Sequence, residues 1–341
     1  MLKKTKSVLI IGLEYKFSLE SFYKKAFYFN GVKKIFFFSN TFYFHLYSFL
    51  RNIKLDFLFF PFRYIYKSRL NLFLKKIKFV NLIIVFKGIE IDKKFLLELK
   101  IKYPNTKIAN IYTDDPFNLA SPSTSSPLVL DCIPEYDFFF IWSKRIKNKL
   151  QRKYKFYKNF YYLPFAYNHR VLKIVKRKIN KNYISFVATG DSYRENIIRK
   201  IKKIKLIIFG NSWPKNLGNH SINNFIYGKK LINITAKSYA SINILRVQNK
   251  TSHNMKTFEI PAMGGLLFTT RSHEQNFFFP ENKASVMFSS IKEFEKKILF
   301  LMNNKKIVDR IRQKGFELSR KHSYNDRAKY LLKLINGNNV K

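Results

Sequence analysis

Short apolar runs alternate with segments of helical spacing along most of the chain. In the N-terminal half, the runs that predict buried strands are residues 7–12, 35–38, 81–86, 108–112 and 136–142. Between them, apolar positions three and four residues apart predict helices at residues 18–29, 95–101 and 144–154. Apolar strands separated by helices indicate a parallel sheet that is covered on both faces.

The same alternation restarts in the C-terminal half. Strands are predicted at residues 183–188, 206–209, 241–245, 266–269 and 286–288, with helices starting near Arg194 and Phe294. The stretch between the halves, residues 164–182, is basic and has no long apolar run. We therefore expect an α/β protein with two facing Rossmann-like domains, residues 1–170 and 171–322, followed by a C-terminal helix in residues 323–341.

Charge adds a second constraint. The 341 residues include 65 Lys and Arg but only 21 Asp and Glu, so the formal net charge is +44. Such a charge attracts nucleic acid, anionic lipid surfaces and phosphorylated small molecules. The basic residues are dispersed, so two interpretations stay open: a solvated surface shaped by codon usage, and electrostatic recruitment, for which an anionic membrane is the favoured partner.

Cysteine content and hydropathy bear on the compartment. Cys132 is the single cysteine, which excludes an internal disulfide and fits a reducing compartment. The N-terminal apolar run is too short for a signal peptide. No stretch approaches the roughly 18 uncharged apolar residues that a membrane span requires. We expect a cytoplasmic protein with peripheral contact at the inner face of the membrane.

Residues 251–270 carry the most informative chemistry. They read as a loop, a short helix, a glycine stop and a buried strand. Ser252 or Asn254 could cap the helix start, where unbonded backbone N–H groups make a site for a diphosphate. Lys256 adds a cation in the first turn, and Glu259 could accept hydrogen bonds from a ribose diol. By spacing alone, an ordinary α/β unit with a solvated Glu is the favoured alternative.

The segment at residues 256–265, Lys-Thr-Phe-Glu-Ile-Pro-Ala-Met-Gly-Gly, resembles the donor-binding motif of the CgeB-like (spore maturation protein) glycosyltransferases. That motif is approximately Arg-x-Phe-Glu-x-x-Ala-x-Gly-Gly. Further segments fit the same family in order and spacing, at residues 112–116, 162–166, 186–195 and 208–213, and in the helix start at 321–328. The resemblance covers roughly residues 80–335 and implies the GT-B fold, which consists of two Rossmann-like domains.

The resemblance also implies residue roles. Glu259 should hold the nucleotide ribose, and Lys256 should neutralise the diphosphate, although without the two-pronged donor of an arginine. Gly190 and Arg194 should assist the phosphates. The family's first Glu would fall at Thr251, which is not acidic, so the donor-sugar contacts of that Glu are in doubt.

Further candidates flank these positions. His253, Asn254 and Thr257 belong to the predicted donor-binding set, with His253 close enough to touch a phosphate. Asp114 and Asp115 end an N-domain strand, so one of them could be the general base of an inverting reaction; a simple Asp-Pro turn is the alternative. The sequence has no Asp-x-Asp and no His/Cys cluster with zinc spacing, so we expect neither a metal nor a cofactor.

The implied activity is transfer of a sugar from a nucleotide-diphosphate donor to a glycan, lipid-linked or protein acceptor, as in enzymes of the hexosyltransferase class. Residues 1–170 would form the acceptor side and residues 171–322 the donor side, with the C-terminal helix packing back across the domains. Two alternatives remain: a basic nucleic-acid-binding protein, which lacks a recognised binding motif, and a catalytically silent protein of the same fold.

Overall fold

The computed structural model describes residues 5–173 and 183–337, and the chain forms two compact units. The N-terminal unit comprises Met1–Pro164 and Tyr324–Lys341, and the C-terminal unit comprises Phe165–Ser323. The division falls at Pro164, against the predicted position 170. Part of the predicted boundary stretch, residues 174–182, lies outside the described residues. The two units are described separately below.

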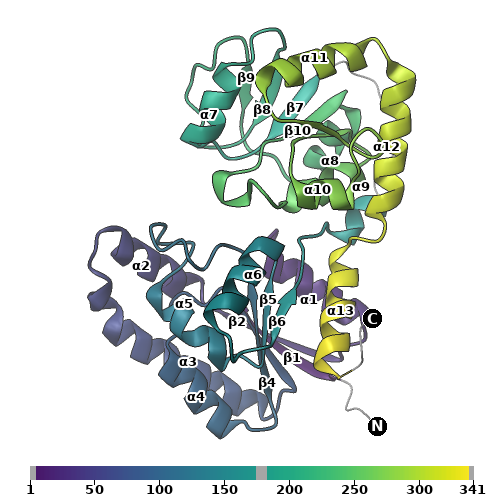
Figure 1. Cartoon of the computed structure of the whole chain (residues 1–341). Helices are drawn as coiled ribbons and strands as arrows, with labels where there is room; N and C mark the ends of the chain where they lie inside the picture. The colour runs from purple at the N-terminus through teal and green to yellow at the C-terminus, as the bar shows by residue number, and fades with distance from the viewer. Residues whose placement is uncertain (1–4, 174–182, 338–341) are drawn as a thin grey trace. The chain divides into compact units, whose positions relative to one another are not determined.

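The N-terminal unit is built on a six-stranded sheet in the order β2-β1-β3-β4-β5-β6, and all neighbours are parallel. The strands are β1 (Ser7–Gly12), β2 (Lys34–Ser39), β3 (Leu82–Phe86), β4 (Lys107–Tyr112), β5 (Phe138–Ile141) and β6 (Phe160–Tyr162). The helices are α1 (Leu19–Phe29), α2 (Thr41–Asn52), η1 (Asp56–Phe59), α3 (Phe60–Ile77), α4 (Lys93–Lys102), α5 (Pro127–Cys132), η2 (Ile133–Glu135), α6 (Lys144–Lys153) and α13 (Tyr324–Ile335). Figure 1 shows α1 and α13 on one face of this sheet and α3 and α4 on the other.

The central strands of this unit are fully buried, as their uninterrupted apolar runs predict. Ser18 caps α1 as predicted, because its side chain accepts a hydrogen bond from the backbone N–H of Ser21. The C-terminal helix α13 belongs to this unit and packs along α1, where Tyr324 contacts the rings of Phe22 and Tyr23. Asn30 ties α1 to α13 through a hydrogen bond to the carbonyl of Asn325.

The C-terminal unit has a second six-stranded parallel sheet in the order β12-β11-β10-β7-β8-β9. The strands are β7 (Ile184–Val187), β8 (Leu206–Phe209), β9 (Ser221–Asn223), β10 (Ala240–Asn243), β11 (Leu267–Thr270) and β12 (Val286–Phe288). The helices are η3 (His169–Lys173), α7 (Ser192–Arg199), α8 (Gly228–Lys237), η4 (Val247–Asn249), α9 (Met255–Ala262), α10 (His273–Phe278), α11 (Ile291–Met302) and α12 (Lys305–Ser319). Its main core joins apolar residues of all these strands except β9 with those of α7, α11 and α12.

The predicted fold class is confirmed: both halves are parallel α/β sheets covered by helices. Among the elements that the periodicity did not predict, β6 and β9 are short, and α2 and α3 are apolar on several sides. Within residues 5–173 and 183–337, no helix combines the length and the apolar character that crossing a bilayer needs. The same residues contain no cluster of three or more His, Cys, Asp or Glu side chains suited to a metal ion.

Candidate functional site

The strand order of the C-terminal unit reverses between β7 and β10. From β7 the chain proceeds outward through β8 and β9, whereas β10 is followed on the other side by β11 and β12. The loops that follow β7 and β10 therefore leave the sheet in opposite directions at its carboxyl edge. Ligands of open α/β sheets bind at such a switch point. The loop after β7 leads into α7, and the loop after β10 leads into α9.

Helix α9 begins with a complete capping box. The side chain of Asn254 accepts a hydrogen bond from the backbone N–H of Thr257 at 3.1 Å, and the Thr257 hydroxyl accepts one from the Asn254 N–H at 3.3 Å. The predicted cap at Asn254, one of two alternatives, is confirmed. The first amides of a helix have no intrahelical acceptor, so the start of α9 presents N–H groups and the positive end of the helix dipole. The helix ends at Ala262, and Gly264 follows in a left-handed conformation with φ 74°.

A buried polar network fixes this helix start against the sheet. Asn243, the last residue of β10, exchanges two hydrogen bonds with Asn254, of 2.9 and 3.1 Å. Its amide nitrogen also donates to Gln275, whose side-chain oxygen accepts further bonds from the hydroxyls of Thr257 and Thr269. Such a satisfied network in a buried setting sets a single geometry. Sequence reasoning missed Asn243 and Gln275. The available signal for Asn243 was a polar residue within a largely apolar strand.

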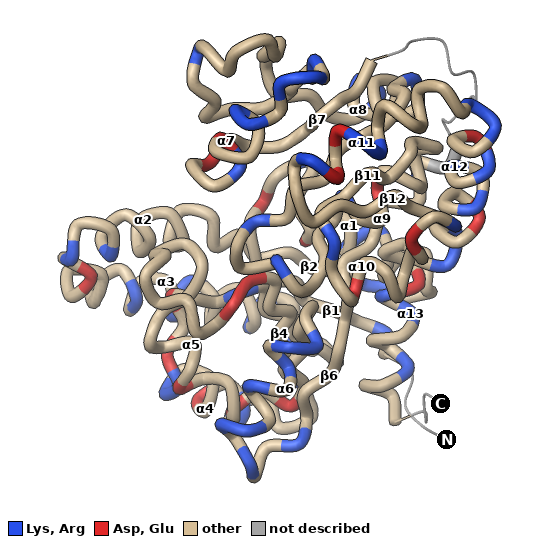
Figure 2. Tube along the Cα trace, turned by 45° about the horizontal axis from the view of Figure 1, so that its top comes forward, with Lys and Arg blue, Asp and Glu red and all other residues tan. Residues whose placement is uncertain are grey.

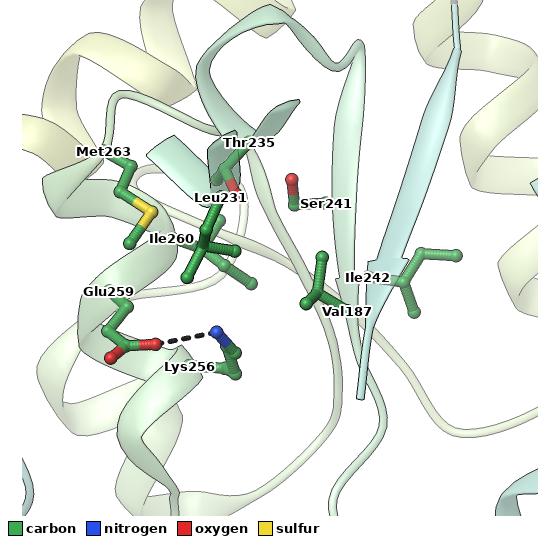
Figure 3. Close-up of a pocket in the computed structure, with 9 residues that line it drawn as sticks. All are labelled: Val187, Leu231, Thr235, Ser241, Ile242, Lys256, Glu259, Ile260 and Met263. Atoms are coloured by element: carbon green, nitrogen blue, oxygen red, sulfur yellow. Dashed lines mark hydrogen bonds and ion pairs between the residues drawn. The ribbon is translucent and has the colours of Figure 1, made fainter. Parts of the chain in front are cut away.

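Lys256 and Glu259 project from the next turn of α9 beside a small pocket (Figure 3). The Lys256 ammonium donates to a Glu259 carboxylate oxygen at 2.8 Å, and both side chains are mostly buried. Apolar side chains from β7, α8, β10 and α9 complete the lining, together with Thr235 and Ser241. The residues that line the pocket are Val187, Leu231, Thr235, Ser241, Ile242, Lys256, Glu259, Ile260 and Met263. The arrangement offers one cation, one carboxylate and an apolar wall within a few residues of a helix N-terminus.

Arg194 joins the two loops of the switch point. Its guanidinium donates two hydrogen bonds to the carbonyl of Ile244, after β10, and one to the carbonyl of Thr189, after β7, at 2.9–3.1 Å. Only 7% of the residue is exposed. Burial lowers the pKa of Arg194 to about 10, so the group is still charged at neutral pH. Arg194 positions the loops, because these donors are directed at backbone carbonyls, and its predicted assistance to the phosphates stays a prediction.

Gly190 permits close packing of two strand-end loops. A Cβ atom at Gly190 would lie 2.2 Å from the carbonyl oxygen of Ser212, in the loop that follows β8. A Cβ at Gly210 would lie 1.8 Å from the carbonyl oxygen of Ala188. The Gly190 N–H donates to the carbonyl of Asn211 at 2.8 Å, so the two loops are also bonded to each other. The structure gives Gly190 a packing role, and its predicted contact with phosphate stays a prediction.

His253 is a core residue. Its side chain is 0% exposed, and its ring lies among the rings of Phe165, Phe258 and Phe278. The Nε2 atom accepts a hydrogen bond from the Phe165 N–H at 3.1 Å, so the ring hydrogen is on Nδ1, which donates to Glu274 at 2.9 Å. The predicted phosphate contact of His253 is therefore corrected. The residue anchors the loop before α9, because both ring nitrogens bond to protein atoms.

Arg246 is a further candidate that sequence reasoning missed. It follows β10 by three residues, and its guanidinium lies 3.4 Å from the carboxylate of Asp191, the N-cap of α7. Its side chain is 47% exposed, in contrast to that of Arg194. A half-exposed arginine at the switch point can reorient its guanidinium group to bind an anion. Among 65 basic residues, its position after the strand was the only available signal.

The two predicted acidic candidates lie in the N-terminal unit, after β4. Asp114 forms an ion pair of 2.5 Å with Lys87, which follows the neighbouring strand β3. Asp115 accepts a hydrogen bond from the Phe117 N–H at 3.0 Å and lies 3.7 Å from the guanidinium of Arg145. Asp115 therefore makes the side-chain turn that its Asp-Pro sequence favours. A role for either carboxylate as a base stays a prediction.

Two more polar side chains are buried near the carboxyl ends of β2 and β3. Asn40, directly after β2, donates to the Glu90 carboxyl at 2.5 Å, and both residues are 0% exposed. Burial raises the pKa of Glu90 to about 7. Within the described part of the chain, the second Glu90 oxygen and the Asn40 carbonyl oxygen have no hydrogen-bond partner. Sequence reasoning did not single out either residue, since each lies outside the strands as predicted.

Comparison with known proteins agrees with this geometry. A family model described as "Glycosyl transferase-like" matches residues 194–333, which run from α7 through the start of α9 to α13. No curated protein matches the sequence significantly. Residues 194–333 contain Arg194, Asn254, Lys256 and Glu259, so most of the predicted donor-binding residues lie within the matched segment.

Solved structures share the fold at low identity. An alpha-glucosyltransferase in complex with UDP and a 13-mer DNA containing an HMU base has a TM-score of 0.68 at 10% identity, covering 98% of this chain and 100% of that one. The pneumococcal O-GlcNAc transferase GtfA, in complex with UDP and GlcNAc, has a TM-score of 0.56 at 10% identity; 79% of this chain aligns with it, spanning 59% of its length. A UDP-GlcNAc 2-epimerase from Neisseria meningitidis has a TM-score of 0.55 at 12% identity, over 97% and 100% of the chains. The chain therefore has the GT-B fold, and residues 194–333 are similar to the glycosyl transferase-like family.

Proposed function

We propose that this protein is a glycosyltransferase of the CgeB-like type that binds a nucleotide-diphosphate sugar at the switch point of its C-terminal unit. One observation carries the proposal: the capped start of α9, with Lys256 and Glu259 on its first two turns, lies at the carboxyl edge of the sheet beside a pocket. A helix N-terminus attracts a diphosphate, and an adjacent carboxylate accepts hydrogen bonds from a ribose diol.

The chemistry follows from these groups. The acceptor hydroxyl oxygen bonds to the anomeric carbon of the donor while the bond from that carbon to the diphosphate oxygen breaks. The nucleoside diphosphate leaves with the electron pair, so negative charge grows on its phosphates. The α9 amides and Lys256 stabilise that charge, with Arg246 as a further cation at the same edge. A base accepts the hydroxyl proton, for which we propose Asp114 or Asp115. This set supplies the charge stabilisation without a metal.

The relatives support a nucleotide-sugar donor. The GtfA structure contains UDP and GlcNAc, and the alpha-glucosyltransferase structure contains UDP. We propose a UDP-sugar as the first donor to test and a glycan, lipid-linked or protein acceptor. Because the chain carries a net charge of +44, we further propose that it works at the anionic inner face of a membrane.

The donor site can be tested by binding. Purified full-length protein is titrated with UDP-, GDP-, dTDP- and CMP-sugars by calorimetry, and the best donor is compared between wild type and Glu259→Ala. Losing hydrogen bonds from two ribose hydroxyls to a carboxylate should weaken affinity about 100-fold. Glu195→Ala is the matched control, because Glu195 lies on α7 and pairs with Arg199 at the surface. Equal affinity of Glu259→Ala and wild type would contradict the site.

A second activity shares this fold. The UDP-GlcNAc 2-epimerase aligns over almost the whole chain, so epimerisation of the donor is the alternative reaction. The two reactions differ in their products. A transferase releases nucleoside diphosphate in proportion to glycosylated acceptor, whereas an epimerase changes the donor sugar in the absence of an acceptor. Following UDP-GlcNAc by NMR without acceptor separates them, and formation of the 2-epimer would overturn the transferase proposal.

A further inference from the structure

Large apolar side chains are exposed on one part of the N-terminal unit. In the described residues, nearly half of such side chains belong to α2, η1, α3 and the short segments that adjoin them, residues 41–79. They are Phe42, Phe49, Ile53, Leu55, Phe57, Leu58, Phe60, Tyr64, Ile65, Leu72 and Phe79. Soluble proteins rarely expose a group of large apolar residues of this size unless it contacts a partner or a membrane.

The helices of this segment are apolar on two sides. In α3, Tyr66, Leu70 and Leu74 are buried against the core, whereas Phe60 and Leu72 point away from it and are 74% and 58% exposed. Helix α2 behaves in the same way, with its own buried and exposed aromatic positions. A surface helix that needed only the core would carry polar residues on its outer side. The second apolar side therefore indicates a second apolar environment.

Positive charge accompanies these apolar residues. The segment has a single acidic residue, Asp56. Its basic residues are Arg51, Lys54, Arg63, Lys67, Arg69, Lys75, Lys76 and Lys78. Figure 2 shows basic positions at the end of α2, in the turn that follows it and along α3. The loop that follows β1 adds exposed Tyr15 and Phe17, and the Tyr15 hydroxyl is 2.6 Å from His45 of α2.

We infer that residues 41–79, together with the loop at residues 13–18, form a docking surface for an anionic lipid bilayer. Phe and Tyr side chains insert at the headgroup level, while lysines bind the lipid phosphates. Each basic residue near an anionic membrane strengthens attachment roughly fivefold. A second copy of this chain fits the surface poorly, because a symmetric contact would bring two strongly basic faces together.

This inference rests on the membrane contact in the proposed function, and it assigns that contact to residues 13–18 and 41–79. It does not depend on sugar transfer, because the docking surface belongs to the N-terminal unit and the donor site to the C-terminal unit. Vesicle binding and nucleotide-sugar binding are therefore separate measurements, and either one can fail alone.

The apolar contribution is tested by vesicle sedimentation of the full-length chain. Vesicles of phosphatidylcholine alone are compared with vesicles that contain about 30% phosphatidylglycerol. The double variant Phe57→Ser with Phe60→Ser should lose at least about tenfold in affinity for the anionic vesicles. The matched control, Tyr28→Ser with Phe156→Ser, changes two equally exposed aromatic residues of the same unit outside this surface and should bind like wild type. Far-UV circular dichroism and donor affinity should be unchanged in both.

The charge contribution is tested in the same assay. Lys75→Glu with Lys76→Glu at the end of α3 should weaken binding at least about 25-fold, because two attractions worth roughly fivefold each are lost and two repulsions are gained. Lys229→Glu with Lys230→Glu is the matched control, because it makes the same charge change at an exposed pair on α8 of the C-terminal unit.

Three results would overturn the inference. The first is equal binding of wild type to neutral and anionic vesicles, or binding to neither. The second is an equal loss in surface and control variants, which would mean that net charge acts without a defined surface. The third is a dimer of wild type in analytical ultracentrifugation that Phe57→Ser with Phe60→Ser dissociates, which would make a second copy the occupant.

Discussion

The carboxyl edges of the two sheets hold their polar side chains in different ways. In the C-terminal unit, one continuous network joins Asn243, Asn254, Thr257 and Gln275, and it links two strand ends to two helix starts. In the N-terminal unit, the polar groups form smaller sets: Lys87 pairs with Asp114 and also bonds to the Ser123 carbonyl, Arg145 pairs with Asp115, and Asn40 with Glu90. Both edges follow parallel apolar strands, but they differ in how their polar side chains bond to one another.

This difference in connectivity determines which edge is fixed before a ligand binds. A shared network moves only as a unit, so the start of α9 keeps its direction whether or not a diphosphate is bound. A small set of polar groups can exchange one partner for a ligand at the cost of few interactions. The C-terminal edge is therefore preorganised, whereas the N-terminal edge can rearrange.

The strongest test of preorganisation is Gly190→Ala. The new methyl group would lie 2.2 Å from the Ser212 carbonyl oxygen, and the backbone must move to accept it. We expect the C-terminal unit to lose more than about 3 kcal/mol, measured as hydrogen exchange of peptides in β7 and α7. Gly218→Ala is the control, because no atom lies within 4 Å and only the positive φ of 71° opposes the substitution. Equal effects of the two would mean that the loops after β7 and β8 are not tightly packed.

The N-terminal edge is tested by Glu90→Gln. The pKa of Glu90 is raised by burial from 4.5 to about 7, so its neutral form stabilises the fold. That stabilisation is complete below pH 4.5 and is lost as the pH rises through 7. Wild type and variant should be equally stable at low pH, and at about pH 8 the variant should be more stable by about 3 kcal/mol.

Urea unfolding, followed by hydrogen exchange in β3, at about pH 4 and about pH 8 measures the Glu90 effect. Glu98→Gln is the control, because Glu98 lies exposed on α4 of the same unit and should show no such difference. A pH-independent difference between Glu90→Gln and wild type would mean that folding does not shift the pKa of Glu90, and the N-terminal edge would then hold an ionised carboxylate at neutral pH.

Much of the fold was predictable from the sequence because buried parallel strands are continuous apolar runs. The strand at residues 206–209 was predicted with the bounds of β8, and the strand at 7–12 with those of β1. Helix α3 was missed because both of its sides carry apolar residues, which removes the helical period. Strands β6 and β9 have three residues each and were missed, although the equally short β12 was predicted from its apolar run.

Only those features of the site that depend on residues close in sequence were predictable. The cap at Asn254 and the placement of Lys256 and Glu259 on one helix follow from residue spacing. The roles of His253 and Arg194 do not, since their partners are distant in sequence: Arg194 bonds to the carbonyl of Ile244, fifty residues away. A sequence shows that a histidine or arginine is near a motif, but only the fold shows which atoms it contacts.

Arg194→Lys tests whether Arg194 acts at the switch point by holding the two loops in position or by its positive charge alone. Lysine keeps the positive charge but replaces three directed hydrogen bonds with a single flexible donor. We expect a loss of about 2 kcal/mol in the stability of α7 by hydrogen exchange, together with weaker donor binding. Arg199→Lys on the same helix is the control, because Arg199 is 45% exposed and pairs with Glu195. Wild-type stability with weakened donor affinity would instead assign Arg194 to direct phosphate binding.

Asn254→Ala tests how much a single side chain contributes to the network. The substitution removes the cap of α9 and the bonds to Asn243, and a lost cap costs about 1 kcal/mol. Asn254→Ser should restore the cap but not the Asn243 bonds, so donor affinity by calorimetry should fall between wild type and Ala. Asn304→Ala is the control, since Asn304 begins α12 without a side-chain capping bond. If Ser matches wild type in donor affinity, the cap alone orients α9, and the continuous network would not be what distinguishes the two sheet edges.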